Sequence, residues 1–275
     1  EITSTESGTM VMTVFDGSPA SKAGIMVGDI ITKVADNDVQ NSTPSEVSNL
    51  IKSTNGTTTI EVLRGGVYKT LEINVEKVSI PSVSSSNFDG VGYIKITTFS
   101  NNTYEQFKTA LSSLEKENID SLVIDVRNNG GGFLNAAVDI AELFIEKGKN
   151  VYGLETKEKT EYYKDSTKES RKYKVGILLN SASASASEIL AAALKESYGA
   201  TLLGLTSYGK GTVQETSELE TGGMIKYTTA YWLTPNGNKI NNVGLKPDVE
   251  ITGDYNDDMD YESDTQLLTA IKNMK

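Results

Sequence analysis

Apolar and polar residues alternate in short runs along the first part of the chain, a pattern typical of strands with one buried face. These runs cover residues 10–14, 29–34, 57–63 and 67–75. One helix is expected between them, because Thr43 stands at an N-cap position, Pro44 follows it, and Glu46 completes a capping box. The sequence therefore predicts a small β-rich module over residues 1–78.

Beyond residue 90 the apolar runs become nearly continuous, as in strands that are buried on both faces. Such strands are predicted over 91–96, 121–126, 175–179 and 201–205, with helices over 103–117, 135–147 and 187–196. The last apolar segments, 224–233 and 249–251, are expected to be antiparallel strands. This alternation predicts an α/β core over residues 91–275, joined to the first module by a serine-rich linker at 79–90.

Composition then narrows the chemistry of this 275-residue chain. It contains no cysteine and no histidine, which excludes a Ser-His-Asp triad, a thiol nucleophile and the usual zinc ligands. Acid–base catalysis would fall to Asp, Glu, Lys or Tyr. With 26 basic and 37 acidic residues the net charge is −11, and this balance argues against nucleic acid as a partner.

A serine-rich segment, Asn180–Glu188, lies between a predicted buried strand and a predicted helix. A serine at such a junction has its hydroxyl near free N–H groups and the positive end of the helix dipole, where a developing oxyanion is stabilised. The same small residues also suit a simple helix cap that packs closely. The residues of this segment alone leave both interpretations open.

The segment Gly204–Gln214 is rich in glycine and contains Lys210. Its first seven residues match the Gly-x4-Gly-Lys part of a P-loop, but Gly211 stands where a Ser or Thr would bind Mg²⁺, which argues against a nucleotide site. Two interpretations remain: a solvated lysine in a glycine-rich loop, or a lysine in a dry site, where burial favours its neutral, basic form. A Ser–Lys pair is a form of the triad that needs no histidine.

A third segment, Asp125–Gly132, follows a buried strand and ends in three glycines. Ligands of open α/β sheets bind beyond the carboxyl ends of the strands, and the glycines let several N–H groups turn toward one point, as an anion hole requires. An ordinary strand-to-helix turn is the alternative. Within this segment Arg127 is expected to have a structural role, whereas Arg64, in the first module, is expected to be a solvated turn residue.

Taken together, several segments resemble the carboxyl-terminal processing peptidases, also called tail-specific serine proteases, and they occur in the family's order. They are Gly17–Ala20, Gly28–Ile31, Asp125–Gly132, Ser183–Glu188, Gly209–Gln214, Leu233–Gly237 and Gly244–Asp248. The resemblance implies an α/β peptidase core with a crotonase/ClpP-like arrangement of sheet and helices. It also implies that the first module is a PDZ-like domain, with a truncated or divergent start.

The resemblance also implies a role for individual residues. Ser185 matches the nucleophile, and Lys210, 210 − 185 = 25 residues downstream, matches the general base. Gln214, one helical turn beyond, matches the residue that positions that lysine. The backbone N–H groups of Gly131 and Ala186 match the oxyanion hole. No metal and no cofactor is implied.

A PDZ-like domain implies capture of an extended peptide by β-addition, with the terminal carboxylate held by backbone N–H groups. The glycine-rich loop that binds this carboxylate is expected before the first strand, and residues 1–9 resemble at most its tail. The implied partners are protein or peptide substrates with exposed C-termini, a regulatory protein, and a second copy held through a helical segment that this sequence lacks. The family setting implies work outside the cytoplasm, in a bacterial envelope or a secreted space.

Two other functions compete with a peptidase. A catalytically idle, PDZ-containing adaptor would keep the fold, but the presence of Ser185, Lys210 and Gln214 together argues against it. An acyl-CoA hydratase-like enzyme would also use a glycine-turn oxyanion hole, but it would need neither the Ser/Lys pair nor the PDZ-like module. The prediction is a serine endopeptidase with a Ser185–Lys210 dyad, gated by the PDZ-like module.

Overall fold

The structure is a computed structural model that describes residues 2–5, 8–15, 17–78, 81–218, 224–256 and 261–275. The chain divides into two compact units, residues 1–80 and residues 81–275. Each unit has a hydrophobic core of its own. The units are therefore treated below as separate folded bodies.

The first unit is an antiparallel sheet with two helices. Its strands lie in the order β1 (Ile2–Thr5), β2 (Gly8–Val11), β3 (Ile30–Val34), β5 (Gly56–Arg64) and β6 (Val67–Val75), and β4 (Asn37–Asp38) pairs with β3. The helices are α1 (Pro19–Lys22) and α2 (Pro44–Ser53). The capping box predicted for α2 is confirmed, since the Thr43 N–H donates to Glu46 Oε2 and the Glu46 N–H donates to Thr43 Oγ1.

The expectation that Arg64 is solvated is wrong. The turn after β5 brings its guanidinium against the loop before β3, where Nε and Nη2 donate to the two carboxylate oxygens of Asp29 at 2.6 and 2.7 Å. Nη2 also donates to the Gly24 carbonyl. Burial raises the pKa of Asp29, but the hydrogen bonds from Arg64 and from the Met26 N–H outweigh it and leave the pKa below its usual value.

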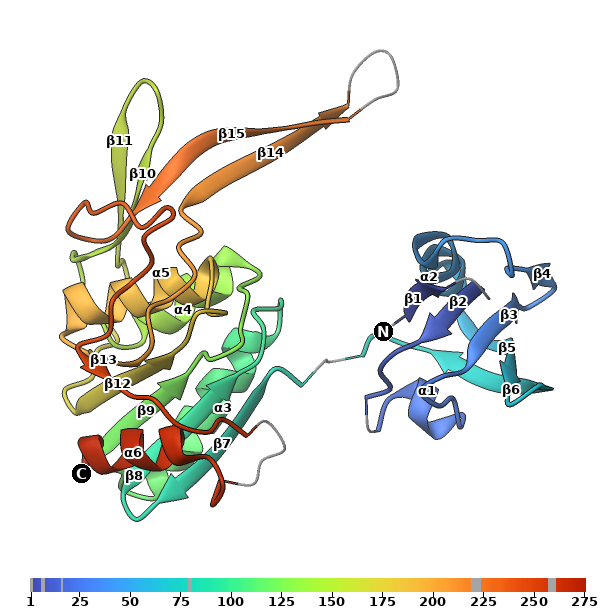
Figure 1. Cartoon of the computed structure of the whole chain (residues 1–275), viewed down its shortest axis with the longest axis horizontal. Helices are drawn as coiled ribbons and strands as arrows, with labels where there is room; N and C mark the ends of the chain where they lie inside the picture. The colour runs from blue at the N-terminus through green and yellow to red at the C-terminus, as the bar shows by residue number, and fades with distance from the viewer. Residues whose placement is uncertain (1, 6–7, 16, 79–80, 219–223, 257–260) are drawn as a thin grey trace. The chain divides into compact units, whose positions relative to one another are not determined.

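The second unit is built on a six-stranded sheet that carries helices on both faces. Its strands lie in the order β16 (Val249–Glu250), β13 (Thr201–Gly204), β12 (Lys174–Leu179), β9 (Ser121–Asp125), β8 (Val91–Ile96) and β7 (Val83–Phe88). All neighbouring strands are parallel except β7 and β8. Helices α3 (Thr103–Lys116), α4 (Leu134–Glu142) and α5 (Ala186–Ala193), with the π-helix η1 (Leu194–Tyr198), pack in one core, and α6 (Thr265–Met274) packs on the opposite face (Figure 1).

A second, antiparallel sheet continues the same unit. Its order is β11 (Thr160–Lys164), β10 (Asn150–Glu155), β15 (Met224–Leu233) and β14 (Thr212–Glu218). The β14–β15 hairpin extends away from the helices (Figure 1). Across all the described residues, no helix is both long enough and apolar enough to cross a bilayer.

Three sequence expectations are wrong in this unit. Residues 83–88, assigned to a linker, form β7, which pairs with β8 through backbone hydrogen bonds that its mostly polar side chains do not prevent. The helix expected to reach residue 147 ends at Glu142, and the buried residues Leu143, Phe144 and Ile145 follow it outside the helix. β16 is parallel to β13, not antiparallel.

Candidate active site

Three loops leave the carboxyl ends of adjacent parallel strands and meet at one edge of the main sheet. They are residues 126–133 after β9, 180–185 after β12 and 205–211 after β13. Crevices at this edge are where open α/β sheets hold their ligands. All three segments singled out from the sequence therefore come together in one place.

Ser185 is the residue that immediately precedes α5, and its backbone is strained. Its φ of 57° and ψ of −116° lie outside the regions that a residue with a Cβ normally adopts. Such a conformation persists only where the surroundings impose it, and it is concentrated at functional sites. It holds the half-buried Ser185 at the N-terminus of a helix in which every residue is buried.

Glu188 imposes much of this geometry. It is 1% exposed and lies in the first turn of α5. Its Oε2 accepts the backbone N–H groups of Ser185 and Lys210, each at 2.9 Å, so these two nitrogens lie within twice that distance of each other. Its Oε1 accepts the Gly209 N–H at 2.7 Å and the Ser207 hydroxyl at 2.6 Å. One buried carboxylate thus fastens the serine loop to the lysine loop.

Two further contacts hold the lysine loop in place. The Tyr208 N–H donates to the Ser183 carbonyl at 2.9 Å, which joins it a second time to the serine loop. Ser207 Oγ, besides donating to Glu188, accepts the Leu245 N–H at 2.7 Å. The loop that carries Lys210 is therefore fixed through its backbone on two sides.

Gly131 lies directly against Ser185. A Cβ added at Gly131 would come within 2.8 Å of Ser185 Cβ and 3.0 Å of the Ala186 nitrogen, so only glycine fits between the two loops. Its N–H, however, donates to Oδ1 of Asn129 at 2.9 Å, and its carbonyl accepts the Phe99 N–H. Ala186 is the first residue of α5, so its N–H has no acceptor within the helix. Both predicted oxyanion donors therefore lie next to Ser185, but the Gly131 N–H is already hydrogen-bonded to Asn129.

Lys210 is exposed, so of the two interpretations of its loop the residues around it form the solvated one and not the dry site. Within the described ranges, no hydrogen bond joins Ser185 Oγ to Lys210 Nζ. Gln214 is also exposed and lies in β14, not one helical turn beyond Lys210. The reason is that Thr212 and Val213 are β-branched and pair with β15 in an extended conformation.

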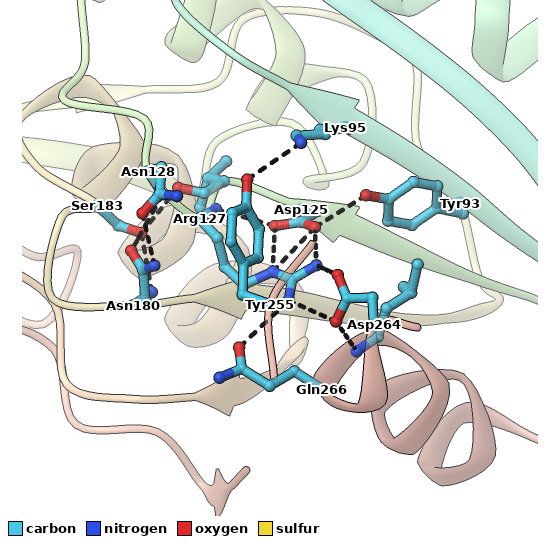
Figure 2. A network of polar contacts seen from close by, with 12 residues as sticks. Tyr93, Lys95, Asp125, Arg127, Asn128, Asn180, Ser183, Tyr255, Asp264 and Gln266 are labelled. Atoms are coloured by element: carbon cyan, nitrogen blue, oxygen red, sulfur yellow. Dashed lines mark hydrogen bonds and ion pairs between the residues drawn. The ribbon is translucent and has the colours of Figure 1, made fainter. Parts of the chain in front are cut away.

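Arg127 is 1% exposed and has the structural role that was predicted for it. Its guanidinium forms ion pairs with Asp125 at 2.6 Å and with Asp264 at 2.8 Å (Figure 2). Burial lowers the pKa of Arg127, but the two carboxylates outweigh it and raise that pKa above its usual value. The Tyr93 hydroxyl donates to the same Asp125 at 2.9 Å.

The model of Peptidase family S41 matches residues 90–251, and that of the PDZ domain matches residues 1–75. The first match covers more than half of the chain. The chain belongs to peptidase family S41. Its first unit matches a PDZ domain, so both parts of the resemblance seen in the sequence, to this peptidase family and to a PDZ domain, are confirmed.

The curated relatives of this S41 peptidase include proteins named probable CtpA-like serine protease. The one from Staphylococcus aureus strain N315 is 40% identical over 246 residues, which cover 88% of this chain and 50% of that protein. The one from Staphylococcus haemolyticus strain JCSC1435 is 37% identical over the same length and shares. The chain thus spans about half the length of the curated relatives it matches.

Solved structures agree with the fold. The photosystem II D1 C-terminal processing protease matches with a TM-score of 0.59 and 29% identity, over 91% of this chain and 71% of that one. A putative S41 protease from Bacteroides fragilis NCTC 9343 matches with a TM-score of 0.59 over 100% of this chain and 81% of that one, at 16% identity, and shows the fold alone. The predicted α/β peptidase core with a PDZ domain is therefore confirmed.

No role was predicted for three residues that bind the loops of this site, Glu188, Asn129 and Asp264. Glu188 was visible only as part of the Ser-Ala motif, yet it stands three residues after Ser185, the spacing of a capping box. That spacing was the available signal. No such signal pointed to Asn129 or Asp264. The Asn129 side chain accepts a hydrogen bond within its own loop, and Asp264 pairs with a residue 137 positions away, so neither leaves a local sequence pattern.

Proposed function

We propose that this chain is a serine endopeptidase of the carboxyl-terminal processing type. Ser185 is the nucleophile, Lys210 is the general base, and Gln214 positions the lysine. The N–H groups of Gly131 and Ala186 form the oxyanion hole. Substrates are proteins or peptides, selected by their C-terminal ends through the PDZ domain.

The reaction proceeds in two halves. Neutral Lys210 accepts the proton of Ser185 Oγ while Oγ attacks the scissile carbonyl carbon, and the carbonyl oxygen becomes an oxyanion that the two N–H groups stabilise. The lysine then returns the proton to the leaving amine, the C–N bond breaks, and an acyl-enzyme remains. Water, deprotonated by the same lysine, releases the new C-terminus and regenerates Ser185.

The observation that carries the proposal is the sharing of Glu188 Oε2 by the Ser185 and Lys210 N–H groups. A serine strained at a helix N-terminus and a lysine loop bound to the same carboxylate have their backbones held close together before substrate binds. The exposed state of Lys210 means that bound substrate must exclude water before the lysine becomes an effective base.

Substrate selection is supported by the first unit. β1 is the edge strand of its sheet among the described residues, so an extended peptide can add to it. A hollow of about 720 Å³ in this unit is lined by Ile2 of β1 and by Ser48 and Ile51 of α2, which suits an apolar C-terminal side chain. The same proposal includes work outside the cytoplasm, a regulatory partner and a homodimer, all carried by the family resemblance.

The test is cleavage of casein, and of an unfolded protein with an apolar C-terminus, with and without a serine-reactive phosphonate. Ser185→Ala and Lys210→Ala are each expected to lower turnover at least ~1,000-fold while the protein stays folded. Ser181→Ala and Lys246→Ala are matched controls, because both residues are exposed near the site and are expected to leave turnover unchanged. Turnover by wild type should rise with alkalinity, as more Lys210 becomes neutral.

The competing idle adaptor predicts a different result. It would bind C-terminal peptides through the first unit, but the wild-type protein would cleave neither substrate, and Ser185 would not react with the phosphonate. Peptide binding with no cleavage over the whole neutral-to-alkaline range would therefore replace the peptidase proposal by the adaptor.

A further inference from the structure

We propose that Asp264 is a positioning residue of the peptidase site: it fixes Arg127, and through Arg127 the loop whose Gly131 lies against Ser185. This inference rests on the proposed function and adds the C-terminal segment to the machinery of the site. It begins from the buried polar network shown in Figure 2.

Arg127 is among the largest fully buried side chains of the chain, and every part of its guanidinium is held. Nη2 donates to Asp125 at 2.6 Å and to Asp264 at 2.8 Å, and Nη1 donates to Asp264 at 3.0 Å and to Gln266 at 3.2 Å. Tyr255 stacks its ring on the same group, 4.6 Å from Cζ. Three of these four partners come from the C-terminal segment, which therefore supplies most of the groups that surround Arg127.

Asp264 has a second task, because it is also the N-cap of α6. Its Oδ1 accepts the Leu267 N–H at 2.8 Å while both of its oxygens accept from Arg127. The residue is 2% exposed. The start of α6 is thus locked to Arg127 by a bidentate ion pair, a geometry that fixes the orientation of the guanidinium as well as its position.

The backbone next to Arg127 is part of the candidate site. The preceding residue, Val126, accepts the Ser183 hydroxyl at 2.7 Å through its carbonyl, and the following residue, Asn128, donates its N–H to Asn180 Oδ1 (Figure 2). Ser183 and Asn180 belong to the loop that carries Ser185. Arg127 is therefore the point at which the C-terminal segment reaches the contact between the serine loop and the glycine loop.

Among the residues that the structure describes, removing Asp264 would leave the buried Arg127 with Asp125 as its only carboxylate partner. Because Asp125 is two residues away on the same segment, that pair cannot hold the segment against α6, where Gln266 would remain as an uncharged acceptor. Asp264 can, since it comes from a helix on the opposite face of the sheet. Displacements of about 1 Å at a reacting group can cost about 100-fold in rate, so a loosened loop is expected to lower kcat.

The experiment compares three variants of the whole chain by steady-state cleavage, thermal unfolding and amide hydrogen exchange of residues 126–132. Asp264→Ser keeps an N-cap acceptor but loses the ion pair. Asp264→Asn is isosteric with the wild-type residue, so it is the variant to assay if Asp264→Ser does not fold. Met274→Ala is the control, because Met274 is 3% exposed at the other end of α6 and weakens the docking of the helix without touching Arg127.

For Asp264→Ser the expected result is a fall in kcat of about 30-fold or more with KM within about threefold, and amide exchange over 126–132 at least about tenfold faster. Asp264→Asn should lose about tenfold in kcat. Met274→Ala should lower the unfolding temperature but leave kcat and the exchange of 126–132 near the wild-type values.

The inference is overturned if Asp264→Ser lowers kcat no more than Met274→Ala, or if exchange over 126–132 does not respond. That result, together with normal wild-type cleavage that Ser185→Ala abolishes, removes the positioning role and keeps the peptidase. Faster exchange in Asp264→Ser with no wild-type cleavage supports the mechanical link and overturns the proposed function, because hydrogen exchange does not depend on catalysis.

Discussion

The backbone N–H of Gly131 donates to Oδ1 of Asn129 over 2.9 Å, although the Gly131 backbone lies against Ser185. If Gly131 is an oxyanion donor, this hydrogen bond has to break when the tetrahedral intermediate forms. A phosphonate adduct on Ser185 mimics that intermediate. We expect the adduct to shift the Gly131 amide resonance much more than that of Gly130, as the N–H turns to the phosphonyl oxygen.

A crystal structure of the same adduct is the second measurement of this prediction. It should show Asn129 Oδ1 without the Gly131 N–H, which then points at the adduct. If the bond to Asn129 persists in the adduct, Gly131 is not an oxyanion donor, and Ala186 must act without it.

Gly131→Ala is expected to abolish peptidase turnover and to lower the free energy of unfolding by about 2 kcal/mol or more. Gly131 has a φ of 104°, and a Cβ there would meet the Ala184 carbonyl oxygen and Ser185 Cβ, both at 2.8 Å. The neighbouring Gly130 is a matched control, since a Cβ there meets nothing within 4 Å. Gly130→Ala should change unfolding by less than about 0.5 kcal/mol and keep its turnover; equal effects of the two variants would refute the steric argument.

Glu188→Gln is expected to lower kcat/KM at least about 100-fold and to destabilise the fold by about 2 kcal/mol. Each carboxylate oxygen of Glu188 accepts at least one backbone N–H, so an amide nitrogen placed at either position would face a donor. Glu196→Gln is the control, because Glu196 is a half-buried residue farther along the same helical segment. Kinetic assay and chemical denaturation of both variants measure the difference, and unchanged turnover in Glu188→Gln would contradict it.

Arg64→Met is expected to lower the unfolding temperature of the PDZ domain by about 5 °C or more at neutral pH, because Asp29 then remains buried without its partner. The folded-state pKa of Asp29 is lowered, so the stability that this group contributes is complete above its ordinary value of 3.8. It is lost as the pH falls through the folded-state pKa. The difference between wild type and Arg64→Met should therefore vanish in strong acid, and a difference independent of pH would argue against the ion pair.

The core of the second unit was readable from the sequence because its strands are buried on both faces. Continuous apolar runs such as 91–96 and 121–125 are typical of strands buried on both faces, and both runs form strands at the predicted positions. The glycine and serine segments then fell at strand ends, which explains why the three loops of the site were found together. The elements that were missed, such as β7, β11 and β14, are edge or hairpin strands with mostly polar residues, so their pairing depends on neighbours far along the chain.

The roles of single residues were predictable only where they depend on local structure. Ser185 and Gly131 have unusual local backbone conformations, and the glycine content and the strand-to-helix junction indicate such conformations in the sequence. Arg64 and Asp264 depend on partners 35 and 137 residues away, and no periodicity encodes such a distance. The exposure of Lys210 also could not be predicted, because it depends on which other groups cover the loop and not on the sequence of the loop itself.

The hydrogen bonds that Glu188 accepts have a practical consequence for the identification of substrates. Ser185, Gly209 and Lys210 all reach it through backbone N–H groups, so shortening the Ser185 or Lys210 side chain removes none of those bonds. Ser185→Ala and Lys210→Ala should then be inert proteins whose loops keep their arrangement, and they should hold a polypeptide without cutting it. Immobilised, they would serve as bait with which the natural targets can be captured and read by mass spectrometry.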